Sequence, residues 1–572
     1  MTFKEYLYER PNMEWIGAEF KKYLKSFSIA KDLETQEHAM KALNKLRNKF
    51  HTQCQLVNIR HSIDANDEFY RIEQDYIDKI KPIFQGYVAD YYRALMASPF
   101  RVELEQRWGT QLFQLAEQAV RAFHPDIIED LQQENKLMTE YNKLIASAKI
   151  QFEGDERTLV QLDPFMRARD RTMRQRASEA YYRFMEDYES EFDRILDDLV
   201  KVRTGMAKKL GYQNYVELGY ARMNRTDYNA KMVANFRLQV LDQVVPLATR
   251  LRERQCSRIG VDTLRYYDEE LSFKDGNPTL KGDSDWVVAN SAKMYAEMSP
   301  ETNEFFTFMM ENGLMDLVSK KGKQGGGYSA FLSEYHAPFV FANFNGSSSD
   351  IHDLTHETGH AFQMYESRHF QVPEYNIPTY EAAEIHSMSM DFFAWPWIKL
   401  FFEEEADKYK FHHLTSAVLF LPYGASIDEF QHFIYEHPEW TPAERRAAWL
   451  NIERKYLPER NYEGCEYLER GGFWHKQGHI FTLPFYYIDY ALAQICALQF
   501  LKRLIIDYEA AWADYLKLCR EGGSKSFTNL VEVAGLVSPF EDGCIASIVG
   551  GLEQQLNEMD DAMSRNEPHH KL

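Results

Sequence analysis

The segment from residue 350 to residue 391 constrains the fold and chemistry of this chain more than any other. It contains His356-Glu357-Thr358-Gly359-His360, and residues four apart lie on one face of an α-helix. His356 and His360 can therefore offer two imidazole nitrogens to one ion, and a catalytic zinc site usually has three protein ligands and a water. Glu357 is placed to take a proton from that water. Chance alone would produce this pattern on the order of a few times in a hundred such chains.

The residues after this motif predict a second helix that supplies a third ligand. Pro373 and Pro378 interrupt the first helix, because proline has no backbone N–H and disfavours helix in the residue before it. Thr379 has the residue type that caps a helix N-terminus. A helix beginning there can return beside the first and bring a carboxylate, from Glu381 or Glu384, to the two imidazoles. The spacing alone does not choose between these two glutamates.

Length, charge and cysteine usage bound the class of protein. A chain of 572 residues has room for two or more domains, or for one large domain with a subsidiary lobe. A net charge of −21 argues against nucleic-acid or anionic-membrane partners, since both demand a basic surface. Six scattered cysteines without a C-x-x-C pair indicate reduced thiols. With no signal peptide and no long apolar run visible, we expect a soluble, cytoplasmic protein.

The periodicity of apolar residues predicts a mainly helical chain. Residues 33–57 and 102–137 repeat apolar side chains at intervals of three, four and seven, and a third helical run spans 169–209. Gly154 and β-branched residues predict a small hairpin within 152–162. Arg203 is interpreted as a structural salt-bridge residue on its helix.

Two segments upstream of the motif are candidates for the substrate cleft. The glycine-rich stretch 321–328 lacks the ending of a phosphate-binding loop and is expected to be a flexible loop near the cleft. Residues 337–344 predict a strand, whose edge could hold an extended peptide through main-chain hydrogen bonds. Phe341 and Asn343 are therefore predicted substrate-binding residues. The alternative is that this strand pairs entirely within a small sheet.

The segment from Leu354 to Asp391 resembles the thimet oligopeptidase-type zinc metallopeptidases (gluzincins), most closely their oligoendopeptidase F branch. The resemblance rests on His-Glu-Thr-Gly-His followed by Glu-Ile-His-Ser-Met-Ser-Met-Asp. It implies that Glu384 is the third zinc ligand, followed by Ser387 in a Glu-x-x-Ser element. Asp391 lies seven residues after Glu384 and so on the same helical face, where it would either orient a ligating histidine or be a solvated charge. The nearby His352 and His386 are interpreted as structural or exposed residues.

A second resembling segment spans residues 474–490. Hydrolysis of a peptide builds negative charge on the former carbonyl oxygen, and a histidine or tyrosine donor would stabilise that charge. The resemblance implies this role for His479 and Tyr490, and substrate binding for Tyr486 and Tyr487. It leaves open which tyrosine contacts the oxyanion.

Together these features predict a mainly α protein with two helical lobes that enclose a deep substrate channel, and a small β-sheet beside the zinc-binding helix. Residues 1–200 would form the N-terminal lobe, 201–565 the catalytic domain and 566–572 a disordered tail. The predicted function is a zinc metalloendopeptidase for short oligopeptides, with one Zn²⁺ per chain. A helical zinc carboxypeptidase and a non-catalytic, zinc-stabilised peptide-binding protein are the alternatives. The oligomeric state stays open.

Overall fold

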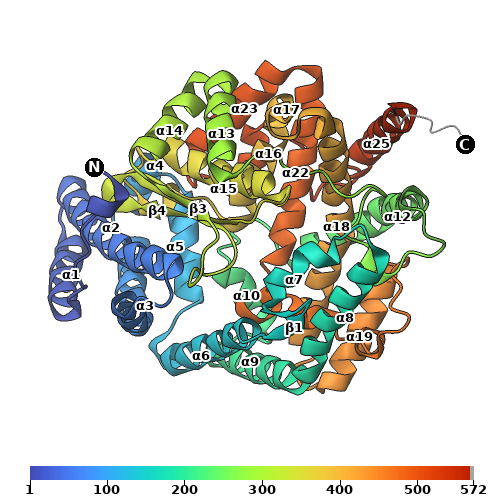
Figure 1. Ribbon diagram of the computed structural model, residues 1–572. Coiled ribbons are helices and arrows are strands. Elements are labelled where there is room, and N and C mark those ends of the chain that lie inside the picture. The colour runs from blue at the N-terminus through green and yellow to red at the C-terminus, as the bar shows by residue number, and fades with distance from the viewer. Residues whose placement is uncertain (567–572) are drawn as a thin grey trace, which may run out of the picture.

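The structure, a computed structural model, describes residues 1–566 (Figure 1). The predicted mainly α class is confirmed, because helices make up most of the chain and the strands form only two small sheets. Residue 566 ends the last helix, and the other residues of the predicted tail lie outside the described residues. None of the helices in residues 1–566 combines the length and the apolar run that a membrane span requires.

The N-terminal helices have a hydrophobic core of their own. In Figure 1 they are blue and stand at one side of the molecule. Phe20, Phe50 and Phe84 pack in this core with Tyr91. The helices are α1 (Met13–Ile29), α2 (Leu33–Ile63), α3 (Glu68–Met96), α4 (Arg101–Trp108) and α5 (Gln111–Arg121).

A larger core holds most of the remaining chain. Leu196 and Val200, which fall before the predicted boundary at residue 200, pack in it with Tyr435 and Phe481. Residues on both sides of residue 200 thus share one core, which also includes Leu56 and Ile59 of α2. The next helices are α6 (Ile128–Ala146), α7 (Leu159–Met166), α8 (Arg171–Asp187), α9 (Glu189–Lys209), α10 (Tyr215–Arg222), α11 (Ala230–Gln239), α12 (Val245–Ile259), α13 (Ser284–Met298) and α14 (Pro300–Glu311).

The predicted hairpin is present, a few residues earlier than expected. Strands β1 (Ile150–Phe152) and β2 (Asp155–Arg157) pair antiparallel. Their two-residue turn, Glu153-Gly154, has positive φ at both positions, which suits the right-handed twist of a tight hairpin.

A three-stranded sheet lies beside the motif helix, in the order β3-β5-β4. Strand β5 (Ala337–Phe344) is parallel to β3 (Met315–Val318) and antiparallel to β4 (Tyr328–Leu332). The strand predicted at 337–344 therefore exists, but the expectation that it offers a free edge is wrong. Both its sides are occupied, and β4 is the edge strand nearest the motif helix among the described residues.

Helices α15 (Ser349–Glu366) and α16 (Tyr380–Phe393) carry the motif and the glutamates that follow it. The short helix η6 (Pro373–Tyr375) separates them, as the prolines predict. A Cβ on Gly359 would lie 2.7 Å from the Cα of Ser387 and 2.8 Å from the carbonyl oxygen of His386. The two helices can approach this closely only because residue 359 has no side chain.

Helix α16 packs against both α15 and α22, so it lies between these two helices. In Figure 1, α15 and α16 (yellow) lie between the N-terminal helices and the C-terminal ones (orange to red). The C-terminal helices are α17 (Lys399–Phe402), α18 (Ala406–Glu436), α19 (Pro442–Tyr456), α20 (Glu466–Glu469), α21 (Gly478–Thr482), α22 (Tyr487–Ile506), α23 (Tyr508–Glu521), α24 (Phe527–Val533) and α25 (Ala546–Asn566).

Candidate active site

Helices α15 and α16 bring the predicted metal ligands together. Oε2 of Glu384 lies 3.3 Å from Nε2 of His356 and 3.4 Å from Nε2 of His360. The three potential ligand atoms all lie within 4.8 Å of one another. The structure thus places Glu384, rather than Glu381, beside the two imidazoles.

The spacing of these atoms fits a bound zinc ion. Tetrahedral coordination at about 2.0–2.1 Å from the ion places two ligand atoms about 3.4 Å apart. A charge-assisted hydrogen bond between nitrogen and oxygen would be shorter, at about 2.7–2.9 Å. The observed separations of 3.3 Å and 3.4 Å therefore match shared coordination better than direct hydrogen bonding.

The carboxylate of Glu384 is held by two hydroxyl groups. The Oγ of Ser387, one helical turn later, lies 2.9 Å from Oε2 and donates to it. The hydroxyl of Tyr486 donates to Oε1. The charges of His360 and His356, and hydrogen bonds from both, keep the pKa of Glu384 well below its ordinary value despite its burial. The Glu-x-x-Ser element thus has a structural reason, since Ser387 fixes the orientation of the carboxylate.

Asp391 lies beside the predicted ligands and contacts His352 more closely than His356. Its Oδ2 is 3.2 Å from Nδ1 of His352 and 3.9 Å from Nδ1 of His356. Thr355 donates a hydrogen bond to its other oxygen. The interpretation of His352 as structural or exposed missed this contact. His352 precedes His356 by four residues and so lies on the same helix face, which could have indicated the contact.

Glu357 faces the glycine-rich loop and the edge strand. The hydroxyl of Ser329, on β4, lies 2.9 Å from its Oε2 and 2.8 Å from its carbonyl oxygen. A Cβ on Gly327 would lie only 3.1 Å from its Oε1. Burial raises the pKa of Glu357 above its ordinary value. Sequence reasoning did not identify Ser329, although it follows the glycine-rich stretch in a short apolar run.

Hydrogen bonds hold the glycine-rich loop at several points. The amide of Asn343 donates to the carbonyl oxygens of Gln324 (2.7 Å) and Gly326 (2.8 Å). The backbone N–H of Gln324 donates to the carbonyl of Ser62 at the end of α2. The expected loop therefore lies near Glu357, anchored to the N-terminal helices.

These contacts bear on the predicted roles of two residues. Phe341 is fully buried, with its ring stacked on Tyr328 at 4.9 Å and Lys323 above it at 4.5 Å. Asn343 uses its amide group on the loop. Phe341 is therefore shielded from a peptide, whereas the half-buried Asn343 anchors the loop and stays a predicted substrate-binding residue.

His479, on α21, is held as a neutral hydrogen-bond donor. The hydroxyl of Tyr423 donates to Oε1 of Gln477, so the Gln477 amide nitrogen faces Nδ1 of His479 at 2.8 Å. That arrangement leaves the proton on Nε2. Burial lowers the pKa of His479 to about 4, so its imidazole is uncharged at neutral pH.

Three tyrosines surround the His479 ring. The ring centroids of Tyr486, Tyr487 and Tyr490 lie 5.6, 5.1 and 5.9 Å from it. Burial and the nearby carboxylate of Glu384 raise the pKa of Tyr490 well above its ordinary value, so its hydroxyl stays protonated. Tyr487 instead packs toward α18.

Arg203 has the structural role that the sequence suggested. Its buried guanidinium pairs with Glu134 at 2.6 Å and donates to the carbonyl oxygen of Phe481 at 2.6 Å. It therefore anchors α21, which carries His479. His386 is also structural, since it is fully buried and its Nδ1 lies 2.8 Å from the carbonyl oxygen of Ala382.

Models of two protein-family domains match the chain. Residues 3–123 match the peptidase M3 N-terminal domain, and residues 165–279 and 287–549 match peptidase family M3. The second match alone covers more than half of the chain. The chain belongs to peptidase family M3. The first match ends at residue 123, and the second begins at residue 165.

Solved structures extend this family assignment to the oligoendopeptidase F branch. A PZ peptidase A solved with an inhibitor is 61% identical, and the match covers 98% of this chain and 100% of that chain with a TM-score of 0.96. An oligoendopeptidase F candidate from Bacillus anthracis is 56% identical over 98% of this chain and 99% of that one, with a TM-score of 0.91. The predicted resemblance is confirmed.

Curated relatives are more distant. An oligoendopeptidase F homolog of Borreliella burgdorferi is 23% identical over 396 residues, which is 65% of this chain and 63% of that protein. A group B oligopeptidase of Streptococcus agalactiae is 24% identical over 65% of this chain and 61% of its own length. The match thus spans less than two thirds of the length of these curated M3 relatives.

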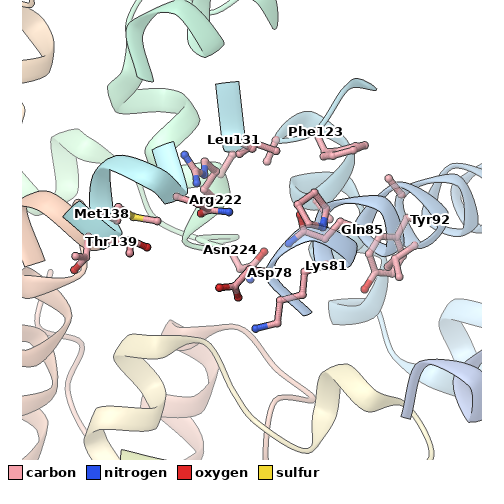
Figure 2. Close-up of a pocket in the computed structure, with 18 of the residues that line it drawn as sticks. Asp78, Lys81, Gln85, Tyr92, Phe123, Leu131, Met138, Thr139, Arg222 and Asn224 are labelled. Atoms are coloured by element: carbon pink, nitrogen blue, oxygen red, sulfur yellow. The ribbon is translucent and has the colours of Figure 1, made fainter. Parts of the chain in front are cut away.

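A cavity of about 670 Å³ lies between α3 and α5 of the N-terminal helices and α6 and α10 of this M3 chain. Figure 2 shows Asp78, Lys81 and Gln85 of α3 on one side of this cavity, and Met138 and Thr139 of α6 on the other. Thr482, at the end of α21, also lines it. The cavity therefore reaches the helix that carries His479.

Proposed function

We propose that this chain is a zinc-dependent endopeptidase that hydrolyses short oligopeptides. The observation that carries the proposal is the set of two imidazole nitrogens and one carboxylate oxygen at the spacing of shared coordination. Three protein ligands leave one position for a substrate or water, whereas structural zinc sites are normally closed by four. Membership of peptidase family M3 supports the same conclusion.

The residues of the chain have distinct roles in this proposal. Bound zinc would polarise the scissile carbonyl and lower the pKa of a water molecule. Glu357 would take the proton of that water and deliver it to the leaving amine. Its raised pKa supports this role, because the carboxyl group must hold the proton between the two transfers.

His479 and the tyrosines would stabilise the charge that develops on the carbonyl oxygen. His479 keeps a proton on Nε2, and Tyr490 keeps its hydroxyl proton. One such donor is typically worth about 10²-fold or more in rate. Tyr486 is better explained as a support for Glu384, to which it donates a hydrogen bond.

We further propose that strand β4 binds the extended peptide. Ser329 on β4 lies beside Glu357, and no other described strand pairs with the outer side of β4. A peptide could add to that edge through main-chain hydrogen bonds. This assignment replaces the predicted role of β5.

A reduced, cytoplasmic location is also part of the proposal. All six cysteines are free thiols, as expected for a protein kept in a reducing compartment.

The test is hydrolysis of an internally quenched peptide of about eight residues whose ends are both blocked. Cleavage that stops with a zinc chelator and returns with zinc would support the endopeptidase. A zinc carboxypeptidase would leave the end-blocked peptide intact but trim the free one. Failure of the zinc-loaded chain to cleave either peptide would favour a non-catalytic binding protein.

A further inference from the structure

A second cavity, of about 280 Å³, lies between α8, α12, α18 and the short helix Phe473–Lys476. It is smaller than the pockets of about 300–1,000 Å³ that take whole drug-sized ligands. Its volume suits a single side chain or the terminus of a bound peptide. Aromatic rings line much of it, namely those of Tyr182, Tyr266, Phe420, Tyr423 and Phe473.

One wall of this cavity continues into the wall of the candidate active site. Phe420 lines the cavity, and its ring lies 5.6 Å from that of Tyr487 and 6.3 Å from that of Tyr490. Tyr423 lines it too, and Tyr423 is the residue whose hydroxyl fixes Gln477 and thereby His479. A ligand held in the cavity would therefore sit next to the residues proposed to bind the scissile bond.

Lys476 brings an ammonium group into this cavity without an acidic partner. Its Nζ lies 4.0 Å from the centre of the Phe473 ring and 3.4 Å from the hydroxyl of Tyr182. Within residues 1–566, no carboxylate oxygen forms an ion pair with it inside 4 Å. Its nearest neighbours are thus aromatic rings and one hydroxyl, with the carboxylates of Glu270, Glu269 and Glu453 farther away.

The other cations that line the cavity are paired. Arg460 lies 2.9 Å from a carboxylate oxygen of Glu269 and 3.3 Å from one of Glu453. Arg252 shares Glu269 at 3.4 Å.

The remaining lining charges also have partners. Arg258 pairs with Asp560 at 3.3 Å. Glu270, the other acidic residue of the lining, lies 3.8 Å from Arg167. Among the described lining residues, Lys476 is therefore the cation without an ion-pair partner, and it can bind an added anion.

The half-buried ammonium of Lys476 has no direct ion-pair partner among the described residues. Burial and the positive charge of Arg460 lower the pKa of Lys476 to about 8. The ammonium is then still mostly charged at neutral pH. A carboxylate arriving there would form a charge-assisted hydrogen bond, the stronger kind in proteins.

We propose that this cavity is a carboxylate-binding subsite of the peptidase, in which Lys476 pairs with a carboxylate of the bound peptide. The proposal rests on the proposed function, since it names the part of the substrate that the cavity recognises. The carboxylate comes from the peptide C-terminus or from an acidic side chain. In either case the enzyme would prefer peptides with a negative charge a short distance from the bond that it cuts.

The test measures binding, so that it does not depend on hydrolysis. Zinc-loaded Glu357→Gln protein is titrated with three fluorescent peptides. Two share one sequence and end in a free acid or an amide, and the third is the amide with an added internal aspartate. Fluorescence anisotropy gives each Kd. We expect one of the two carboxylate-bearing peptides to bind about tenfold or more tightly than the plain amide, because a hydrogen bond to a charged group is worth that much. Which of the two gains affinity identifies the source of the carboxylate.

Adding Lys476→Met should remove this preference and leave the Kd of the amide peptide within about twofold. Lys455→Met is the matched control, because Lys455 also packs on an aromatic ring but pairs with Glu429 outside the cavity. If Lys476→Met does not fold, Lys476→Gln is measured in its place. No preference for either carboxylate, or a preference that survives both Lys476 variants, would overturn the proposal. Failure of the proposed function would show separately, as loss of hydrolysis of the amide peptide by the zinc-loaded chain with Glu357 intact.

Discussion

The hydroxyl of Tyr486 donates a hydrogen bond to Oε1 of Glu384, the carboxylate whose other oxygen faces the two motif histidines. Outer contacts of this kind orient a metal ligand, and their loss typically costs about 10- to 100-fold in metal affinity. Tyr486→Phe should therefore bind zinc about 10- to 100-fold more weakly in a competition with a chelating dye. Tyr487→Phe is the control, since the Tyr487 ring packs on Phe420 and Tyr423. Equal zinc affinity for Tyr486→Phe and the parent would contradict this role.

Gly359 sets the distance between α15 and α16. An alanine methyl group there would meet backbone atoms of Ser387 and His386 at 2.7–2.8 Å, so the helices must separate. We expect Gly359→Ala to lower both the melting temperature and the zinc content. Gly205→Ala, in α9 four residues before its end and with open space around the added methyl group, should be neutral or stabilising by up to about 1 kcal/mol. A Gly359→Ala protein with full zinc content would show that the helix spacing is less strict than the structure indicates.

The two glutamates of α16 should respond differently to amide substitution. Glu384→Gln removes a ligand, so we expect bound zinc to fall below detection in elemental analysis after dialysis. Glu381→Gln should keep one zinc per chain, because Glu381 is turned toward Thr379 and the Arg225–Asp489 pair. Zinc loss in Glu381→Gln with retention in Glu384→Gln would reverse the ligand assignment.

Glu381 should also make stability depend on pH. Burial and the negative charge of Asp489 raise the pKa of Glu381 to about 8, against about 4.3 for an unfolded glutamate. The folded chain then holds a proton that the unfolded chain releases, so the free energy of unfolding falls as pH rises from about 4 to about 8. The slope is at most about 1.4 kcal/mol per pH unit. The melting temperature of Glu381→Gln relative to the parent should therefore rise from pH 5 to pH 8, and a pH-independent difference would contradict this.

The amide of Asn343 should affect both catalysis and the proteolysis of the glycine-rich loop, because it anchors that loop. Asn343→Ala removes both hydrogen bonds to that loop, next to Glu357. We expect kcat/KM to fall about tenfold with zinc content unchanged, and trypsin to cut faster after Lys321 or Lys323. Asn235→Ala, which loses a surface contact to Asp542, is the control. Unchanged proteolysis together with unchanged kinetics would show that the loop does not need this anchor.

The sequence predicted the helical class and the metal ligands because their signals are local. Two histidines four apart share a helix face, and the prolines after them interrupt the helix. The choice between Glu381 and Glu384 came from the family resemblance. Its physical basis, the burial of Glu381 against Asp489 and Arg225, joins residues far apart in the chain.

The remaining features depend on partners that local patterns do not reveal. The run 337–344 predicts a strand, but its central position depends on two short strands whose own patterns are weak. Helical periodicity marks the buried face of α9, yet not which core that face enters. The contact between Ser329 and Glu357 joins residues 28 positions apart across a loop. These features are fixed by tertiary packing.

The most direct test of the account is a single comparison of the parent chain with Glu357→Gln. Both proteins are loaded with zinc, and metal content and hydrolysis of the end-blocked peptide are measured together. We predict one zinc per chain in both proteins, cleavage by the parent, and a rate about 10²- to 10⁴-fold lower for the variant. Ordinary cleavage by Glu357→Gln, or a parent that binds no zinc, would contradict the account.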